Sequence, residues 1–380
     1  MIKGFKNKGM KAVAMFLISL LLMGSIFVAG ASQEDYSVED YYVDEETALK
    51  HAVIYLEEFV ADGTSGLEGW DGATVQKDPV TVYDIHGKKL FYEFTVTKDG
   101  KTIGEMEMAA SKVLGCLLNR IIVTEPIDRI SMEQKAIEIV KEEFSGWEIL
   151  SIKPVCYSYP KEGVMLTLVK SGTKEEKTVI LDSYTSSVVP LKEPKKDGDI
   201  GAWSIYDKIP DKERAEMVQN WNELQKITTM GKSTRGSKTL SVTKYAQEYS
   251  NWCAAAVGQM IGKYHGYTHP QSTVADYMGL DPGYGGGASI SDQLVYYKYG
   301  INKVYSHGDS SPSFSEEKTE INANRPFMGG IVGHARCGRG YSESVLGDYI
   351  YINDPWPVDI GATYWEWWGL RTHDDDIHVF

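Results

Sequence analysis

Cysteine, basic residues and long apolar runs are all scarce in this sequence. Four cysteines among 380 residues exclude a fold held by a disulfide framework. Cys116 and Cys156 are either a disulfide or two buried thiols. Lysine and arginine total 39 against 53 acidic residues, a net charge of −14, which argues against nucleic acid or an anionic membrane as a partner. Only the N-terminus carries a long apolar run, so we expect a soluble mature protein.

That apolar run has the form of a signal peptide. Four lysines precede the apolar residues 12–28, and the small residues 29–31 follow as a cleavage pattern. We predict a signal peptide at 1–31 and a secreted, extracellular protein. An uncleaved membrane anchor is the alternative, because the run is near the ~17-residue lower limit for crossing a bilayer. Cleavage leaves 35 basic and 53 acidic residues, a net charge of −18.

The N-terminal half contains one pattern twice, a helix followed by strands. The first helix runs from Glu45 through about Phe59, and the second begins at Ser131, which forms a capping-box pattern with Gln134. Alternating apolar residues predict strands near 80–83, 90–96 and 103–108, with a hairpin turn at 98–101, and then near 149–158, 164–170 and 177–181. The repetition predicts an α+β region of two units, about 32–124 and 125–194.

Residues 195–238 have the composition of a linker that carries one helix. Pro210 and Asp211 begin the helix, which is predicted over 211–227 with an apolar stripe that docks on a neighbouring domain. The segment 230–238 is polar, rich in small residues and contains three basic residues. We therefore place a processing cleavage within 230–238.

Cys253 stands where a polar turn becomes a helix. From Ala254 the apolar residues Val257, Ile261 and Tyr264 recur at helical spacing, and the pattern stops at Gly266. A thiol at a helix N-terminus faces unpaired N–H groups and the positive end of the helix dipole, which lower its pKa to a range of about 3.5 to 7.5. Cys253 is therefore a candidate nucleophile.

Three further residues can complete a site around this thiol. His334 lies in an apolar, strand-like stretch, and Asp354 ends a second one. Gln247, six residues before Cys253, can place an amide donor where an oxyanion would form. Cysteine, histidine and then a carboxylate or amide is the chain order of papain-like enzymes. Asn353 competes for the third position, and strand alternation points it and Asp354 to opposite faces.

These motifs resemble the secreted papain-like cysteine peptidases allied to the bacteriocin-processing (double-glycine-leader) peptidases. The resemblance covers roughly residues 240–370 and implies an α+β peptidase domain at 239–380, with a helical half and an antiparallel β half. It implies Cys253 as nucleophile, His334 as general base and acid, Asp354 as the residue that orients the imidazole, and Gln247 in the oxyanion hole. Cys337 departs from the family pattern and leaves room for a competing disulfide or redox control.

Other motifs near the site have simpler interpretations. The glycine-rich loop 281–289 lacks a dinucleotide fingerprint and a Walker lysine, so it fits the border of a substrate cleft better than a phosphate site. His265 and His269 do not form a helical metal pair, because Gly266 and Pro270 interrupt the helix. We expect neither a metal nor another cofactor.

Two features near the C-terminus also have structural explanations. The aromatic run 364–368 is interpreted as core packing rather than as a sugar-binding platform. Asp374, Asp375 and Asp376 are interpreted as a solvated face, since a calcium site needs more oxygen ligands. Trp356, close to Asp354, is predicted to shield the His–Asp hydrogen bond from water.

The sequence thus predicts a secreted zymogen that hydrolyses a peptide or protein substrate. The two N-terminal units resemble the PepSY-like or cystatin-like modules of secreted bacterial propeptides, which implies a prodomain at 32–194 that inhibits the peptidase. A folding or adhesion module is the alternative for these units. For the C-terminal domain, acyl transfer of the transglutaminase type and an inactive binding module are the alternative functions.

Overall fold

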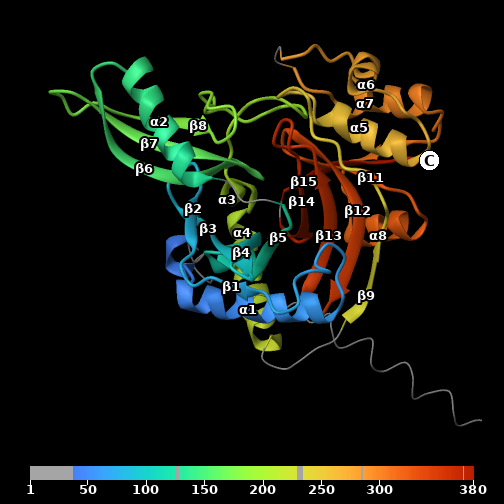
Figure 1. The fold of residues 1–380 in the computed structure, drawn as a ribbon, viewed down its shortest axis with the longest axis horizontal. Coiled ribbons are helices and arrows are strands. Elements are labelled where there is room, and N and C mark those ends of the chain that lie inside the picture. The colour runs from blue at the N-terminus through green and yellow to red at the C-terminus, as the bar shows by residue number, and fades with distance from the viewer. Residues whose placement is uncertain (1–36, 125–127, 229–233, 284–285, 371) are drawn as a thin grey trace, which may run out of the picture. The chain divides into compact units, whose positions relative to one another are not determined.

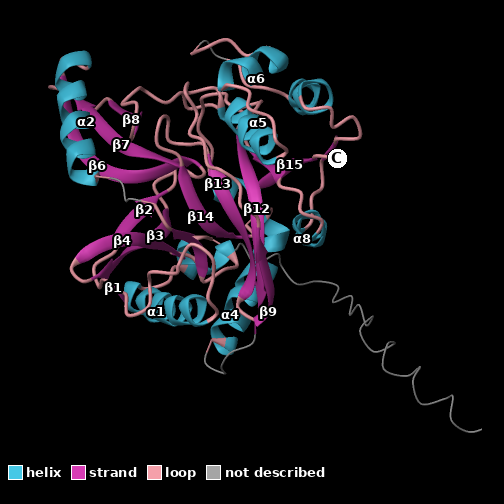
Figure 2. Ribbon diagram, turned by 45° about the vertical axis from the view of Figure 1, so that its right-hand side comes forward, coloured by secondary structure: helices cyan, strands magenta, loops and turns pink. Residues whose placement is uncertain are grey.

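Helices and strands are mixed throughout the chain, as the predicted α+β class requires (Figures 1 and 2). The computed structural model describes residues 37–124, 128–228, 234–283, 286–370 and 372–380. The predicted signal peptide, 1–31, lies outside these residues. Within them, no helix is long and apolar enough to cross a membrane.

The first predicted unit is a helix followed by an antiparallel sheet. Its elements are η1 (Glu39–Tyr41), α1 (Glu45–Ala61), β1 (Thr74–Val75), β2 (Val80–Tyr83), β3 (Lys89–Lys98), β4 (Lys101–Ala109), η2 (Lys112–Leu114) and β5 (Leu118–Ile122). The side chain of Asp44 caps α1 by accepting the N–H of Thr47 at 2.7 Å. Asp99 and Gly100 have φ of 52° and 75°, the left-handed conformation that a tight hairpin between β3 and β4 needs.

The second predicted unit is also a helix followed by antiparallel strands, three instead of five. It contains α2 (Arg129–Glu143), β6 (Trp147–Ser158), β7 (Lys161–Lys170) and β8 (Glu176–Asp182). The predicted capping box at Ser131 is wrong. Asp128 is the N-cap, and its carboxylate accepts the N–H of Ser131 at 3.1 Å, so the helix begins two residues before Ser131. An aspartate at an N-cap satisfies a free helix N–H at least as well as a serine does.

The remaining elements carry the candidate site. They are α3 (Ile205–Lys208), α4 (Asp211–Ile227), β9 (Thr234–Thr239), α5 (Cys253–Tyr264), α6 (Gln271–Met278), α7 (Ile290–Val295), the π-helix η3 (Tyr296–Gly300), β10 (His307–Asp309), α8 (Phe314–Asn322), β11 (Phe327–Ile331), β12 (His334–Ser344), β13 (Gly347–Asp354), β14 (Ala362–Trp367) and β15 (His373–His378). Helices α5, α6 and α7 contact one another beside the strands β11 and β12 (Figure 1).

One hydrogen-bonded sheet runs through both halves of the chain. Its order is β10-β15-β11-β12-β13-β14-β5-β4-β3-β2-β6-β7-β8, with β1 on β3 and β9 on β12. The joint is the antiparallel pairing of β14 with β5, in which Tyr364, Trp365 and Glu366 face Ile122, Ile121 and Arg120. The sequence pattern does not predict that β14 pairs with β5, because the backbone groups at a strand edge are the same whichever strand pairs with them. The first unit is therefore continuous with the C-terminal sheet.

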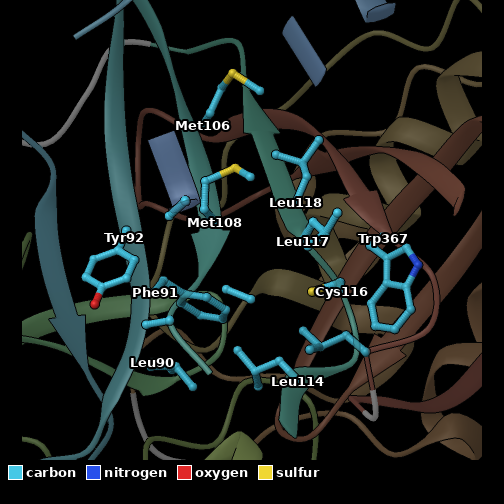
Figure 3. Packing of buried hydrophobic residues seen from close by; sticks show 14 of the residues in the cluster. Leu90, Phe91, Tyr92, Met106, Met108, Leu114, Cys116, Leu117, Leu118 and Trp367 are labelled. Atoms are coloured by element: carbon cyan, nitrogen blue, oxygen red, sulfur yellow. The ribbon is translucent and has the colours of Figure 1, made fainter. Parts of the chain in front are cut away.

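Side chains from both halves share one apolar core. Met106 and Met108 of β4 and Leu118 of β5 lie in the same cluster as Trp367 of β14 (Figure 3). The aromatic run 364–368 contributes Trp365 and Trp367 to this core, in line with the packing interpretation.

The predicted linker contains a docked helix and, at its C-terminal end, a strand. Helix α4 has the predicted bounds and packs on η2, with Met217 and Trp221 in the core of the first unit. Residues 234–238 were predicted as flexible, and this is wrong, because they lie in β9 and pair with β12. A backbone held in a sheet is a poor protease substrate. The rest of the predicted cleavage segment, 230–233, lies outside the described residues.

Truncation of Trp365 tests the shared core. Trp365 is fully buried, stacks on Tyr351 at 4.5 Å between ring centroids, and donates from Nε1 to the carbonyl of Ser65 at 2.9 Å. Trp365→Ala should lower the free energy of unfolding by about 3–5 kcal/mol, since it leaves a cavity between the two halves. Urea denaturation followed by circular dichroism measures the change. The control Tyr305→Ala, at a side chain 81% exposed, should stay within ~0.5 kcal/mol of the parent chain.

Candidate active site

Helix α5 places Cys253 at its first turn, against the strands of the C-terminal sheet. Nine of its residues are buried, and the helix contacts β11 and β12. The Cys253 sulfur accepts the backbone N–H of Ala335 at 3.5 Å. Ala335 directly follows His334, so this contact brings the thiol next to the histidine. Packing of an alanine-rich helix face on the sheet is what allows this close approach.

His334 and Asp354 form a buried pair at neighbouring strand ends. His334 begins β12, Asp354 ends β13, and His334 Nε2 lies 2.7 Å from Asp354 Oδ1. The same carboxylate accepts the hydroxyl of Tyr364 at 2.7 Å and the backbone N–H of Trp356 at 2.8 Å. His334 Nδ1 has no hydrogen-bond partner among the described residues. The nitrogen left for chemistry is therefore Nδ1.

The ionisation of this pair follows from burial and mutual attraction. Burial alone would raise the pKa of Asp354, but the His334 ring and the Tyr364 hydroxyl bring it below its ordinary value. Burial lowers the pKa of His334, and Asp354 opposes that effect. The carboxylate is thus kept charged and the imidazole neutral, which is the state in which histidine can accept a proton.

The Cys253 thiol differs from the sequence prediction. Burial raises its pKa to about 12, and the nearby Asp197 carboxylate acts in the same direction. The predicted lowering by the helix N-terminus is therefore wrong for this state of the molecule. Cys253 is 1% exposed, and the loss of water around a thiolate outweighs the attraction of the helix dipole. The raised pKa favours the protonated thiol over the thiolate in this covered state.

Gln247 is buried, but its amide is engaged elsewhere. Nε2 donates to the carbonyls of Tyr249 at 2.8 Å and Ser250 at 2.9 Å, which uses both N–H groups. Its backbone N–H donates to the carbonyl of Pro355, in the loop after Asp354. The predicted oxyanion role needs a free amide donor, and this arrangement does not supply one. Gln247 instead ties the loop before α5 to the loop after β13.

Asn353 and Asp354 point to opposite faces of β13, as alternation predicts. The Asn353 amide donates to the carbonyl of Val242 at 3.1 Å, and its oxygen accepts from Arg339 at 3.0 Å. Only Asp354 contacts His334. Trp356 is 7% exposed and lies beside this pair, under the ammonium of Lys161 at 5.1 Å from the ring centre.

Two segments outside the predicted peptidase domain cover the site. Residues 194–201, where the predicted prodomain meets the predicted linker, cross it, and Lys161, at the start of β7, lies close enough to lower the pKa of both Cys253 and His334. His334 is 0% exposed. The predicted inhibitory prodomain, 32–194, includes Lys161, although the sequence did not single out this residue. Residues 195–201 were interpreted as linker, and the only signal in them is Asp197 and Asp199 on either side of a glycine.

A buried ionic network lies beside the site and was also missed. Arg336 donates to Glu366 at 2.6 Å, Tyr159 donates to the same carboxylate at 2.8 Å, and Arg120 pairs with Glu107 at 2.5 Å. In the described part of the chain, one set of carboxylates has the spacing of a metal site, namely Glu93, Glu107 and Glu162. Arg120 and Arg129 already pair with these carboxylates, so the residues present do not fit a metal ion.

The structure also bears on the predictions for the cysteines and for the acidic residues 374–376. All four cysteines are buried free thiols, so neither the Cys116–Cys156 bridge nor a Cys253–Cys337 disulfide is present. The interpretation of 374–376 as a solvated face is wrong for Asp376. It is fully buried, accepts the N–H of Gly330 at 3.0 Å, and burial raises its pKa well above the ordinary value.

Part of the chain is similar to a known peptidase family. Residues 239–368 match the model of the Peptidase_C39 like family, and this range contains Gln247, Cys253, His334 and Asp354. The match supports a relationship to C39-type cysteine peptidases. No curated protein matches the chain.

Asp197 makes the covering segment sensitive to pH. Burial raises its pKa to about 7, Asp374 and Asp375 add to this, and Gln293 and Lys161 oppose it. Because the folded-state pKa lies above the ordinary 3.8, ionisation of Asp197 disfavours the docked segment, so its stability falls as pH rises from 3.8 to about 7 and is constant above that. The protection factors of the amides of residues 195–200 in hydrogen exchange, corrected for intrinsic rates, should therefore fall by up to about tenfold per pH unit in this pH range.

A pair of variants isolates the carboxylate. Asp197→Asn should flatten the pH dependence of exchange, while the control Asp276→Asn, at an exposed aspartate, should leave it unchanged. An Asp197→Asn chain with the parent pH dependence would contradict the assignment.

Proposed function

We propose that the chain is a secreted cysteine peptidase that hydrolyses peptide bonds through Cys253, His334 and Asp354. One observation carries this proposal. Asp354 holds the His334 ring through Nε2, which leaves Nδ1 without a partner among the described residues. The next residue, Ala335, donates its backbone N–H to the Cys253 sulfur, so the imidazole and the thiol are neighbours. The match of this region to a cysteine peptidase family supports the same conclusion.

Each residue has a role that follows from its contacts. His334 Nδ1 takes the thiol proton, and Asp354 stabilises the imidazolium and keeps Nε2 protonated. The thiolate attacks the carbonyl carbon of the scissile bond, and the backbone N–H of Cys253 at the start of α5 donates to the oxyanion. His334 then protonates the leaving amine. Water, deprotonated by His334, hydrolyses the thioester and restores the thiol.

The closed site supports synthesis as a zymogen. A substrate cannot reach a thiol that is 1% exposed, and a thiol with a pKa near 12 is not a nucleophile at neutral pH. Removal of the cover returns water to the helix N-terminus and lowers the thiol pKa. Strand β5 of the first unit pairs with β14 at three positions, whereas β6 of the second unit pairs with β2 only at Val155 and Tyr83, so the proposed moving cover is residues 194–201 and the strands β6–β8. The signal pattern at 1–31 supports secretion.

Alanine and asparagine variants test the catalytic assignment. In a peptide-library assay read by mass spectrometry, Cys253→Ala should abolish hydrolysis, and His334→Ala should lower kcat by about 10⁴-fold or more. Asp354→Asn should reduce kcat by a smaller factor, because the imidazole keeps a neutral partner.

Cys337→Ala is the matched control, since it removes another buried thiol only three residues from His334. It should keep kcat within a few-fold of the parent. Hydrolysis that survives in Cys253→Ala would refute the proposal. Products that carry an added amine instead of a new carboxylate would show that the same site performs acyl transfer.

A further inference from the structure

The two oxygens of the Asp354 carboxylate accept hydrogen bonds from different groups. Oδ1 lies 2.7 Å from His334 Nε2 and accepts the backbone N–H of Trp356 at 2.8 Å. Oδ2 accepts the Tyr364 hydroxyl at 2.7 Å, which is its one hydrogen bond among the described residues. Because Asp354 is 1% exposed, loss of that hydroxyl would leave a buried, charged oxygen without its donor.

The strand register brings the Tyr364 phenol to this carboxylate. Tyr364 of β14 lies opposite Ile352 of β13, and Ile352 is two residues before Asp354. Side chains two residues apart on a strand point to the same face, so Tyr364 and Asp354 are diagonal neighbours on one face of the sheet. The separation of about 7–8 Å between such positions is within reach of an aromatic side chain. A tyrosine at this position therefore delivers a hydroxyl to Asp354.

Arg336 determines which way the Tyr364 hydroxyl points. Its Nη1 lies 3.4 Å from the Tyr364 oxygen, and its side chain is 0% exposed. A guanidinium has donors only, so the phenol oxygen accepts from Arg336 and its single proton is left for Asp354. Burial and the Asp354 charge raise the pKa of Tyr364 well above its ordinary value, so the hydroxyl keeps that proton.

Arg336 is itself held in place. Its Nη1 donates to Glu366 Oε2 at 2.6 Å, and Tyr159 donates its hydroxyl to the same oxygen at 2.8 Å. The positive charge of Arg336 lowers the pKa of Asp354, the same direction as the Tyr364 hydrogen bond. Lys244, in the segment before α5, also interacts with Asp354, which opposes the lowering of the Lys244 pKa by burial.

We propose that Tyr364 is a positioning residue for the reaction, whose hydroxyl, oriented by Arg336, fixes the Asp354 carboxylate in the rotation that presents Oδ1 to His334. This inference rests on the proposed peptidase function and deepens it. The Cβ–Cγ torsion of an aspartate has only a broad, roughly two-fold preference, so the side chain alone does not select this rotation. An imidazole whose partner can rotate spends less time with Nδ1 directed at the thiol.

Tyr364→Phe removes the hydroxyl and keeps the ring. With the peptide that the parent chain hydrolyses fastest in the library, kcat should fall by about 10- to 100-fold, the rate equivalent of one hydrogen bond to a charged group. KM should stay within about twofold, because Tyr364 acts on Asp354 and not on substrate. The matched control is Tyr349→Phe on β13, a buried tyrosine whose hydroxyl donates to the Leu118 carbonyl at 3.1 Å. It loses a buried hydrogen bond away from the pair and should keep the parent kcat.

The titration of Asp354 provides a second measurement, which a purely structural role would not change. The carboxyl carbon resonance of Asp354 in NMR is identified by its loss in Asp354→Asn. Because the Tyr364 hydroxyl lowers the pKa of Asp354, this resonance should titrate at a higher pH in Tyr364→Phe than in the parent. In Tyr349→Phe it should titrate as in the parent.

A double variant tests whether Tyr364 acts through Asp354. Asp354→Asn combined with Tyr364→Phe should be about as slow as Asp354→Asn alone, whereas independent effects on kcat would multiply and overturn the inference. A parent-like kcat or an unshifted Asp354 titration in Tyr364→Phe would also overturn it and leave the peptidase function standing. Absence of hydrolysis by the parent would overturn both proposals. Circular dichroism of each variant distinguishes lost activity from lost fold.

Discussion

The pairing of β5 with β14 is the contact on which the rest of this structure depends. It joins the first unit to the sheet that carries His334 and Asp354, and it places Tyr364 of β14 so that its hydroxyl bonds to Asp354. The same ladder brings Arg120 of β5 opposite Glu366, beside the buried network that surrounds Arg336. The unit predicted as part of a prodomain thus helps to support the Asp354 carboxylate of the candidate site. Its loss would expose a large apolar face.

Desolvation controls the state of the candidate site. The same burial that keeps the His334–Asp354 bond dry also raises the pKa of the Cys253 thiol, because a thiolate loses more by leaving water than the helix N-terminus returns. Geometry and charge are therefore separate properties of the candidate site. The His334–Asp354 bond is present in the covered molecule, whereas burial disfavours the thiolate.

Local patterns predicted most individual elements. Helical spacing predicted α1, α4 and α5, and alternation predicted β2, β3 and β4 with the hairpin at Asp99 and Gly100. These predictions succeeded because the elements bury one continuous apolar face, which periodicity reports directly. Ser131 was wrongly predicted as the N-cap because serine and aspartate are both favoured at that position, and Asp128 lies only three residues before it. Residues 234–238 were misread because their polar side chains do not reveal a backbone paired with β12.

The sequence by itself determined the order of the candidate residues Cys253, His334 and Asp354 and the helix start at Cys253. It also predicted that Asn353 and Asp354 face opposite sides of their strand, and the resemblance to the peptidase family selected Asp354. The helix start and the strand faces depend on spacing along one segment. Only the tertiary structure decided that the Gln247 N–H bonds to Pro355, that Asp376 is buried, and that Gly198 bonds to Gly333 beside His334. Such contacts depend on which segments meet after folding, and the physical quantities that follow from them, burial and ionisation, belong to the assembled site rather than to any stretch of chain.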